Sequence, residues 1–66
     1  MKKYKVTICY YGRFEPATGH QEYLKEVVEI ESFSPLNAEL SAADELGIRQ
    51  YYAAWVEEVL QLPQFN

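Results

Sequence analysis

The sequence predicts an α+β fold, in which three strands form an antiparallel sheet and one helix packs on one face of it. Two segments with alternating apolar residues flank a stretch that contains glycine and proline, a pattern typical of a β-hairpin. A segment with helix start and stop residues follows, and a third alternating segment comes last. We therefore expect a single ββαβ domain over residues 1–66, with strands at about 3–11, 22–33 and 50–62 and a helix at about 35–46.

The first expected strand, KYKVTICYY, has two distinct faces. One face consists of Tyr4, Val6, Ile8 and Tyr10, and the other of Lys5, Thr7, Cys9 and Tyr11. The next segment, GRFEPATGHQ at 12–21, contains two of the three glycines and one proline, so it predicts a hairpin connection longer than a tight turn. Its one large apolar residue, Phe14, is expected to fold back over the sheet edge or, alternatively, to contact a partner.

The second strand has an apolar face and a mixed face. The apolar face consists of Leu24, Val28 and Ile30, and the mixed face of Tyr23, Lys25, Val27, Glu29 and Glu31. Glu26 interrupts the apolar face. A charge in this position is typical of a β-bulge or of an edge strand, where it also discourages pairing with other chains.

The helix is recognised by its ends. Ser34 is a candidate N-cap, Pro35 occupies the first helical position, and Gly47 is the expected left-handed stop. Ile48 is placed for the apolar contact that accompanies a glycine stop. At about 100° per residue one narrow stripe of the helix is apolar, and we expect this stripe to pack on the sheet. It consists of Leu36, Leu40 and Ala43, with Leu46 at its edge.

The third strand has two possible orientations. In the preferred one, the small Ala54 faces the helix together with Tyr52 and Val56. The opposite side then carries Tyr51, Trp55 and Glu57. The size of Trp55 leaves the choice open, because in the reverse orientation Trp55 would belong to the core. A hairpin followed by a right-handed helical crossover gives the strand order 2-1-3.

The sheet face away from the helix has no further segment to cover it, so we expect the functional surface there. The register places Lys5 among glutamates at one end of this face and groups tyrosines at the other end. Trp and Tyr are enriched at binding hot spots, although cross-strand aromatic and charged pairs also stabilise a sheet without any partner. The candidate partner-binding residues are Tyr11, Tyr23, Glu29, Glu31, Tyr51, Trp55 and Glu57.

The net charge of −4 is unevenly distributed along the chain. Residues 1–21 carry four basic residues and one acidic residue, a net of +3, whereas residues 22–58 carry nine acidic and two basic residues, a net of −7. Nucleic-acid binding draws most of its affinity from Lys and Arg, so this balance argues against direct binding of nucleic acid. Two interpretations remain, a solvated acidic surface or a surface that binds a basic partner.

Residues suited to catalysis are scarce. The chain has one histidine and one cysteine, which is too few for a zinc site, and it lacks a glycine-rich phosphate loop. His20 and Glu22 are close in sequence but are typical of a solvated pair. We expect no enzyme activity, no metal and no cofactor. The lone Cys9, together with the lack of a signal-like or membrane-spanning run, predicts a cytoplasmic protein.

The short, acidic and tyrosine-rich chain, which starts MKKYKVTICYYG, resembles the small inhibitors encoded by bacteriophages, among them the anti-CRISPR proteins. The resemblance implies inhibition by occupying a basic host surface, such as a nucleic-acid-binding site of a CRISPR-Cas subunit in the host cytoplasm. The leading hypothesis is therefore a non-enzymatic inhibitor that docks an acidic and aromatic surface on a basic protein. The alternative is a self-associating accessory domain with the open sheet face as its homodimer interface, so both a monomer and a homodimer remain possible.

Overall fold

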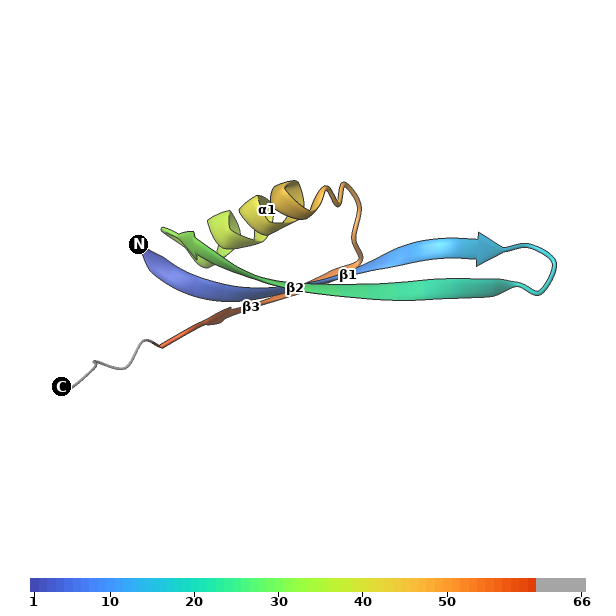
Figure 1. The fold of residues 1–66 in the computed structure, drawn as a ribbon, viewed down its shortest axis with the longest axis horizontal. Helices are drawn as coiled ribbons and strands as arrows, with labels where there is room; N and C mark the ends of the chain where they lie inside the picture. The colour runs from blue at the N-terminus through green and yellow to red at the C-terminus, as the bar shows by residue number, and fades with distance from the viewer. Residues whose placement is uncertain (61–66) are drawn as a thin grey trace.

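The computed structural model describes residues 1–60, which form a three-stranded antiparallel sheet with a helix on one face (Figure 1). The strands are β1 (Lys2–Glu15), β2 (His20–Ser32) and β3 (Ala53–Glu58), and the helix is α1 (Pro35–Leu46). The order β2-β1-β3 makes β1 the central strand. The predicted α+β fold and the strand order 2-1-3 are confirmed. Among the described residues, no helix has both the length and the apolar character needed to cross a membrane.

The register of the sheet brings together the charged residues that the sequence predicted to be neighbours. Lys5 on β1 lies opposite Glu29 on β2 and Glu57 on β3. One step further along β1, Thr7 lies opposite Trp55. All of these residues lie on the face away from the helix, because the alternate residues of β1 form the core. The preferred orientation of the third strand therefore holds for Trp55.

The third strand is shorter than the expected strand at 50–62. It begins at Ala53, because residues 47–52 connect the end of α1 to the sheet. It ends at Glu58. Residues 61 and 62 of the expected strand lie outside the part of the chain that the structure describes.

The hairpin between β1 and β2 is longer than predicted, so the expected loop at 12–21 is wrong. The strands continue to Glu15 and His20, and only Pro16 to Gly19 form the turn. Gly19 has a positive φ of 72° and donates its N–H to the Glu15 carbonyl at 2.8 Å. The end of the hairpin extends beyond the helix as a two-stranded ribbon, which we call the arm (residues 10–24; Figure 1).

Gly12, which suggested a loop, instead occupies a β-bulge in the arm. The register of the hairpin shifts between Tyr11 and Phe14. A Cβ on Gly12 would lie 2.8 Å from Cδ1 of Leu24, so a larger residue would displace that side chain. The side-chain amide of Gln21 donates to the Gly12 carbonyl at 3.2 Å, which satisfies an acceptor at the bulge.

Two expectations about single hairpin residues have different outcomes. Phe14 does not fold back over the sheet, because it belongs to β1, pairs with Gln21 and is exposed. Glu26 lies on the edge strand β2, opposite Ile8, as one of its two predicted positions required. The hydroxyl of Tyr10 donates to Glu26 Oε1 at 3.4 Å. The charge therefore stays at the edge of the sheet, where water reaches it.

The ends of α1 are confirmed. The Ser34 side chain accepts a hydrogen bond from the Asn37 N–H at 3.1 Å, which satisfies one of the free donors of the first turn. Gly47 is left-handed, with a φ of 72°. Beyond it the Ile48 N–H donates to the Ala43 carbonyl at 2.9 Å, and the Ile48 side chain packs against the core.

The helix packs on the sheet mainly through alanines, so the predicted apolar stripe is wrong for Leu36 and Leu40, whereas Ala43 and Leu46 do contact the core. Ala38 and Ala42 are fully buried and Ala43 is nearly so, whereas Leu36 is exposed and Leu40 is 57% exposed. Large side chains of the sheet already fill the space below the helix, so only a face of small residues lets the two come close. The core consists of Tyr4, Val6, Ile8, Ile30, Ala38, Ala42 and Ala43, surrounded by Tyr10, Val28, Leu46, Ile48, Tyr51, Ala54 and Val56.

The alanine contact predicts that added volume at Ala42 destabilises the fold. Ala42→Leu forces three more carbon atoms into a closed contact and should lower the free energy of unfolding by about 1–3 kcal/mol. Ser41→Leu is the control, because Ser41 is exposed and the change should matter by less than about 0.5 kcal/mol. Urea unfolding followed by circular dichroism measures both variants. Equal effects would show that the helix does not rest on its alanines.

The central position of β1 predicts an uneven pattern of hydrogen exchange. Residues Tyr4 to Cys9 have a paired strand on each side, so their amides should exchange most slowly. Residues 12–22 of the arm pair only with each other, and their amides should exchange faster by at least about tenfold. Exchange rates measured by NMR test this pattern, and slowest exchange in the arm would contradict it.

Candidate functional site

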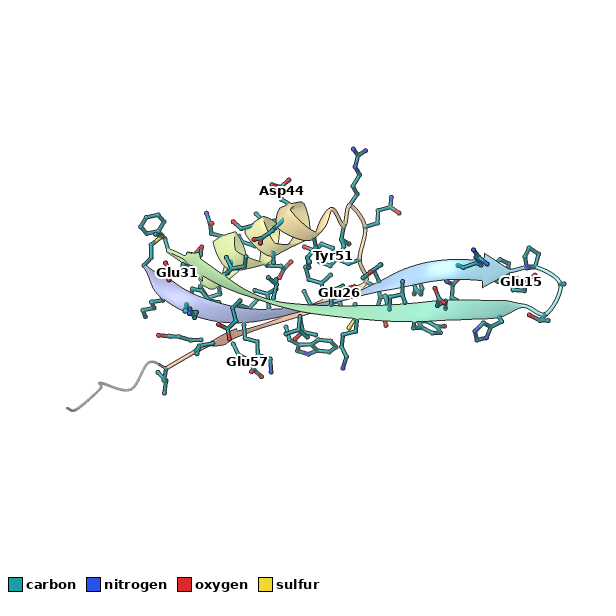
Figure 2. All side chains as sticks on the ribbon, viewed as in Figure 1. Glu15, Glu26, Glu31, Asp44, Tyr51 and Glu57 are labelled. Carbon is teal, nitrogen blue, oxygen red and sulfur yellow. The ribbon has the colours of Figure 1, made fainter. Side chains whose placement is uncertain are left out.

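The sheet face away from α1 is not covered by any other described segment, and we call it the open face (Figure 1). Its apolar side chains include Trp55, which is 56% exposed, and Val27, which is also exposed. Both lie opposite Thr7 of the central strand. In Figure 2, Glu57 lies on this side of the sheet, whereas Tyr51 lies between the sheet and the helix.

Three tyrosines on the open face meet at the base of the arm, and we call them the tyrosine cluster (Tyr11, Tyr23 and Tyr52). The ring centroids of Tyr11 lie 4.8 Å from Tyr52 and 5.6 Å from Tyr23, and those of Tyr23 and Tyr52 are 6.2 Å apart. These distances are typical of favourable aromatic pairs. Desolvation by its neighbours raises the pKa of Tyr52. All three side chains nevertheless remain exposed, so the cluster also has surface to offer a partner.

Tyr51 does not belong to the open face, so its predicted place in the binding surface is wrong. Its side chain packs against the core, and its hydroxyl donates to Glu39 Oε2 at 2.7 Å. This hydrogen bond raises the pKa of Tyr51, with desolvation as the second cause.

Tyr52 takes the place on the open face that was predicted for Tyr51. The two tyrosines precede β3, where the alternation of a regular strand does not apply. The Tyr52 N–H donates to the Cys9 carbonyl at 3.0 Å, which holds Tyr52 against the central strand. No residue type in the sequence marks this bend before β3, because the expected period of two continues through both tyrosines.

The charged part of the open face is electrically neutral. Three lysines and three glutamates lie there: Lys3, Lys5, Lys25, Glu29, Glu31 and Glu57. Lys3 Nζ lies 3.6 Å from Glu29 Oε2. The predicted glutamates therefore occupy the predicted face, but lysines of the same face offset their charge.

The net charge of −4 comes from the rest of the molecule. The chain has ten acidic and six basic residues, so removing the three of each on the open face leaves seven acidic and three basic residues. Figure 2 shows two of these acidic residues, with Asp44 on the outside of the helix and Glu15 near the end of the arm. The acidic surface and the aromatic surface are thus separate, although the sequence predicted them as one.

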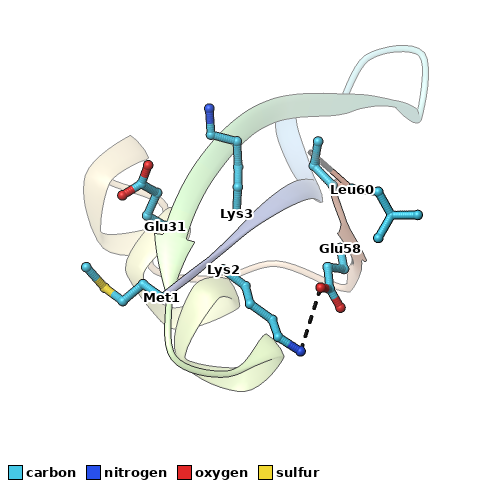
Figure 3. A pocket seen from close by; sticks show the side chains of 7 residues that line it. Met1, Lys2, Lys3, Glu31, Glu58 and Leu60 are labelled. Carbon is cyan, nitrogen blue, oxygen red and sulfur yellow. Dashed lines mark ion pairs between the residues drawn. The ribbon is translucent and has the colours of Figure 1, made fainter. Parts of the chain in front are cut away.

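A shallow pocket lies at the end of the sheet near the N-terminus (Figure 3). Lys2 Nζ lies 3.7 Å from Glu58 Oε1 at this pocket, and Lys3 has its own glutamate neighbour. Two lysines that already have carboxylates nearby are typical of a solvated charged surface. The lining residues are Met1, Lys2, Lys3, Glu31, Glu58, Val59 and Leu60.

The residues with the most reactive side chains lie far apart. Cys9 is buried in the central strand, where it pairs with Lys25, whereas His20 is exposed beside the turn of the arm. Within residues 1–60, no three His, Cys, Asp or Glu side chains form a group that could hold a metal ion.

No protein-family model matches the chain, and neither a curated protein nor a solved structure does. The open face therefore has to be interpreted from its own chemistry.

The position of Tyr51 predicts a pH-dependent contribution to stability. Tyr51→Phe removes the hydrogen bond to Glu39 and should lower the free energy of unfolding by about 0.5–1.5 kcal/mol at pH 7. Because the folded pKa of Tyr51 is raised, the advantage of the wild type should be full below about pH 10 and should be lost as the pH rises through the folded pKa. Denaturant unfolding at several pH values tests this, with the exposed Tyr23→Phe as the control. A larger loss for Tyr23→Phe than for Tyr51→Phe at pH 7 would contradict the prediction.

Proposed function

We propose that the protein is a non-enzymatic inhibitor that binds a protein partner with its open face. The observation that carries the proposal is the exposed Trp55 on the same uncovered face as the tyrosine cluster. Trp and Tyr dominate the residues whose truncation weakens protein–protein complexes most. A sheet holds these side chains in fixed positions, so that less conformational freedom is lost on binding.

The proposed partner has a basic surface. The open face is neutral, so its aromatic side chains would supply most of the affinity. The net charge of −4 on the rest of the molecule would speed the encounter with a basic protein. The resemblance to bacteriophage inhibitors extends the proposal to a nucleic-acid-binding component of a host defence system, such as a CRISPR-Cas subunit. Inhibition would then consist of covering that surface.

The proposal predicts that Trp55 is an anchor of the complex. Trp55→Ala should weaken partner binding by more than about 2 kcal/mol while the protein stays folded, because the helix packs on the other face. Leu40→Ala is the matched control, since Leu40 has nearly the same exposed fraction but lies outside the open face. The partner is first captured with wild type from a bacterial lysate at low salt, and binding of the purified proteins is then measured by calorimetry. Equal weakening by both variants would contradict the proposal.

The salt dependence of binding and the oligomeric state of the protein distinguish this function from self-association through the open face. Docking on a basic protein should slow as ionic strength rises, whereas an apolar homodimer should not respond in this way. Size-exclusion chromatography of wild type and Trp55→Ala completes the comparison. A homodimer that Trp55→Ala dissociates would favour the accessory-domain alternative, and an unchanged oligomeric state with lost partner binding would favour the inhibitor.

A further inference from the structure

The outer edge of β2 has no strand beside it among the described residues. On β1, the carbonyls of Lys3 and Cys9 accept hydrogen bonds from Val59 and Tyr52, so the odd-numbered residues of β1 direct their backbone groups toward β3. Backbone groups of an antiparallel strand alternate between its two sides, so the even-numbered residues bond to β2. Given the register, β2 turns the backbone groups of its own odd-numbered residues outward. These residues are Tyr23, Lys25, Val27, Glu29 and Glu31.

We infer that β2 pairs antiparallel with β2 of a second copy of this chain, centred on Val27. The two sheets then form one continuous six-stranded sheet. Residues 23–31 face residues 31–23 of the second copy, and the outward N–H and C=O groups can form about ten hydrogen bonds. Val27 is exposed in the single chain and would face its own equivalent at the centre.

The charges along β2, together with the exposed Val27, favour this register. With Val27 at the centre, Lys25 of each copy faces Glu29 of the other copy, which gives opposite charges at two symmetric places. A register centred on Lys25, Glu26 or Glu29 would instead place like charges directly opposite each other. Centring on Val28 would also set Lys25 opposite a glutamate, Glu31, but it would place the exposed Val27 against the charged Glu29 instead of against its own equivalent.

Lys25 is well placed for the contact between copies. Lys25 lies opposite Cys9 within its own sheet, and no described strand lies on its other side. Glu29 lies 3.6 Å from Lys3 and more than half of its side chain remains exposed. Edge strands commonly carry charges that repel further strands. On β2 the charges Lys25 and Glu29 lie at equal distances on either side of Val27 and have opposite signs. They therefore attract a second copy instead of repelling it.

The arm gives a second, independent argument for a second copy. β3 pairs with β1 only as far as Cys9, and the helix does not extend over the arm (Figure 1). A two-stranded ribbon is marginally stable by itself in water. In the inferred register residues 22–24 of the arm lie beside residues 32–30 of the second copy, so the base of each arm gains a third strand and Leu24 gains Ile30 as a neighbour.

The test uses two variants that should each lose the dimer and regain it when mixed. Lys25→Glu places two Glu–Glu contacts in the dimer, and Glu29→Lys places two Lys–Lys contacts, so each variant should raise the dimer dissociation constant at least about tenfold. A mixture restores both opposite-charge contacts and should give a heterodimer close to wild-type affinity. Because Lys and Glu are almost equal in mass, one variant is uniformly labelled with ¹⁵N, and native mass spectrometry then distinguishes the heterodimer from both homodimers.

Glu31→Lys is the control, because Glu31 faces Tyr23 in this register and the dimer should persist. Val27→Cys gives a readout that does not depend on charge, since the two cysteines would face each other about 5.5 Å apart and should form a disulfide between copies. Glu31→Cys should not form it. A wild type that is monomeric at about 100 μM, single charge variants that remain dimeric, or a mixture without heterodimer would overturn the inference. Trp55 takes no part in this edge, so the open-face proposal stands or fails separately.

Discussion

The contact between the alanine face of α1 and the central strand is the constraint on which the rest of the structure depends. Val6 and Ile8 on β1 and Ala38 and Ala42 on α1 have no exposed surface. The helix has 12 residues and is about 18 Å long, whereas the 14 residues of β1 span about 46 Å. One helix therefore covers less than half of the hairpin, and the arm continues beyond the core because nothing remains in the described chain to cover it.

The same constraint determines what the protein exposes. A helix that rests on alanine turns Leu36 and Leu40 away from the sheet, and a single helix leaves the second face of the sheet open. A chain of 66 residues buries only about 60% of the surface that its unfolded state exposes, so its margin of stability is small. Contacts outside the chain can add to that margin. The open face and the outer edge of β2 are the surfaces on which such contacts fit the chemistry best.

The sequence predicted the order of elements and the register, because each of these depends on local signals. The caps Ser34 and Gly47 define the helix, and alternation in β1 and β2 pairs Lys5 with Glu29. Three features depend on contacts that a linear pattern does not contain. Gly12 has the residue type of a loop, and only its pairing with β2 shows that it lies in a bulge. The face of the helix that contacts the sheet is determined by the size of its side chains rather than by their hydrophobicity. Tyr51 lies on the helix side of the sheet rather than on the open face, because the chain bends before β3 begins.

The edge of β2 and the open face are compatible with each other. Antiparallel pairing centred on Val27 joins odd-numbered residues to odd-numbered residues, so both open faces lie on the same side of the six-stranded sheet. Two copies of Trp55 and two tyrosine clusters would then face one partner surface. After one open face binds, the second is held at high effective concentration, and a contact of modest strength becomes a stable complex without any new interaction. A small domain with a thin core can in this way bind more tightly than the area of one copy allows.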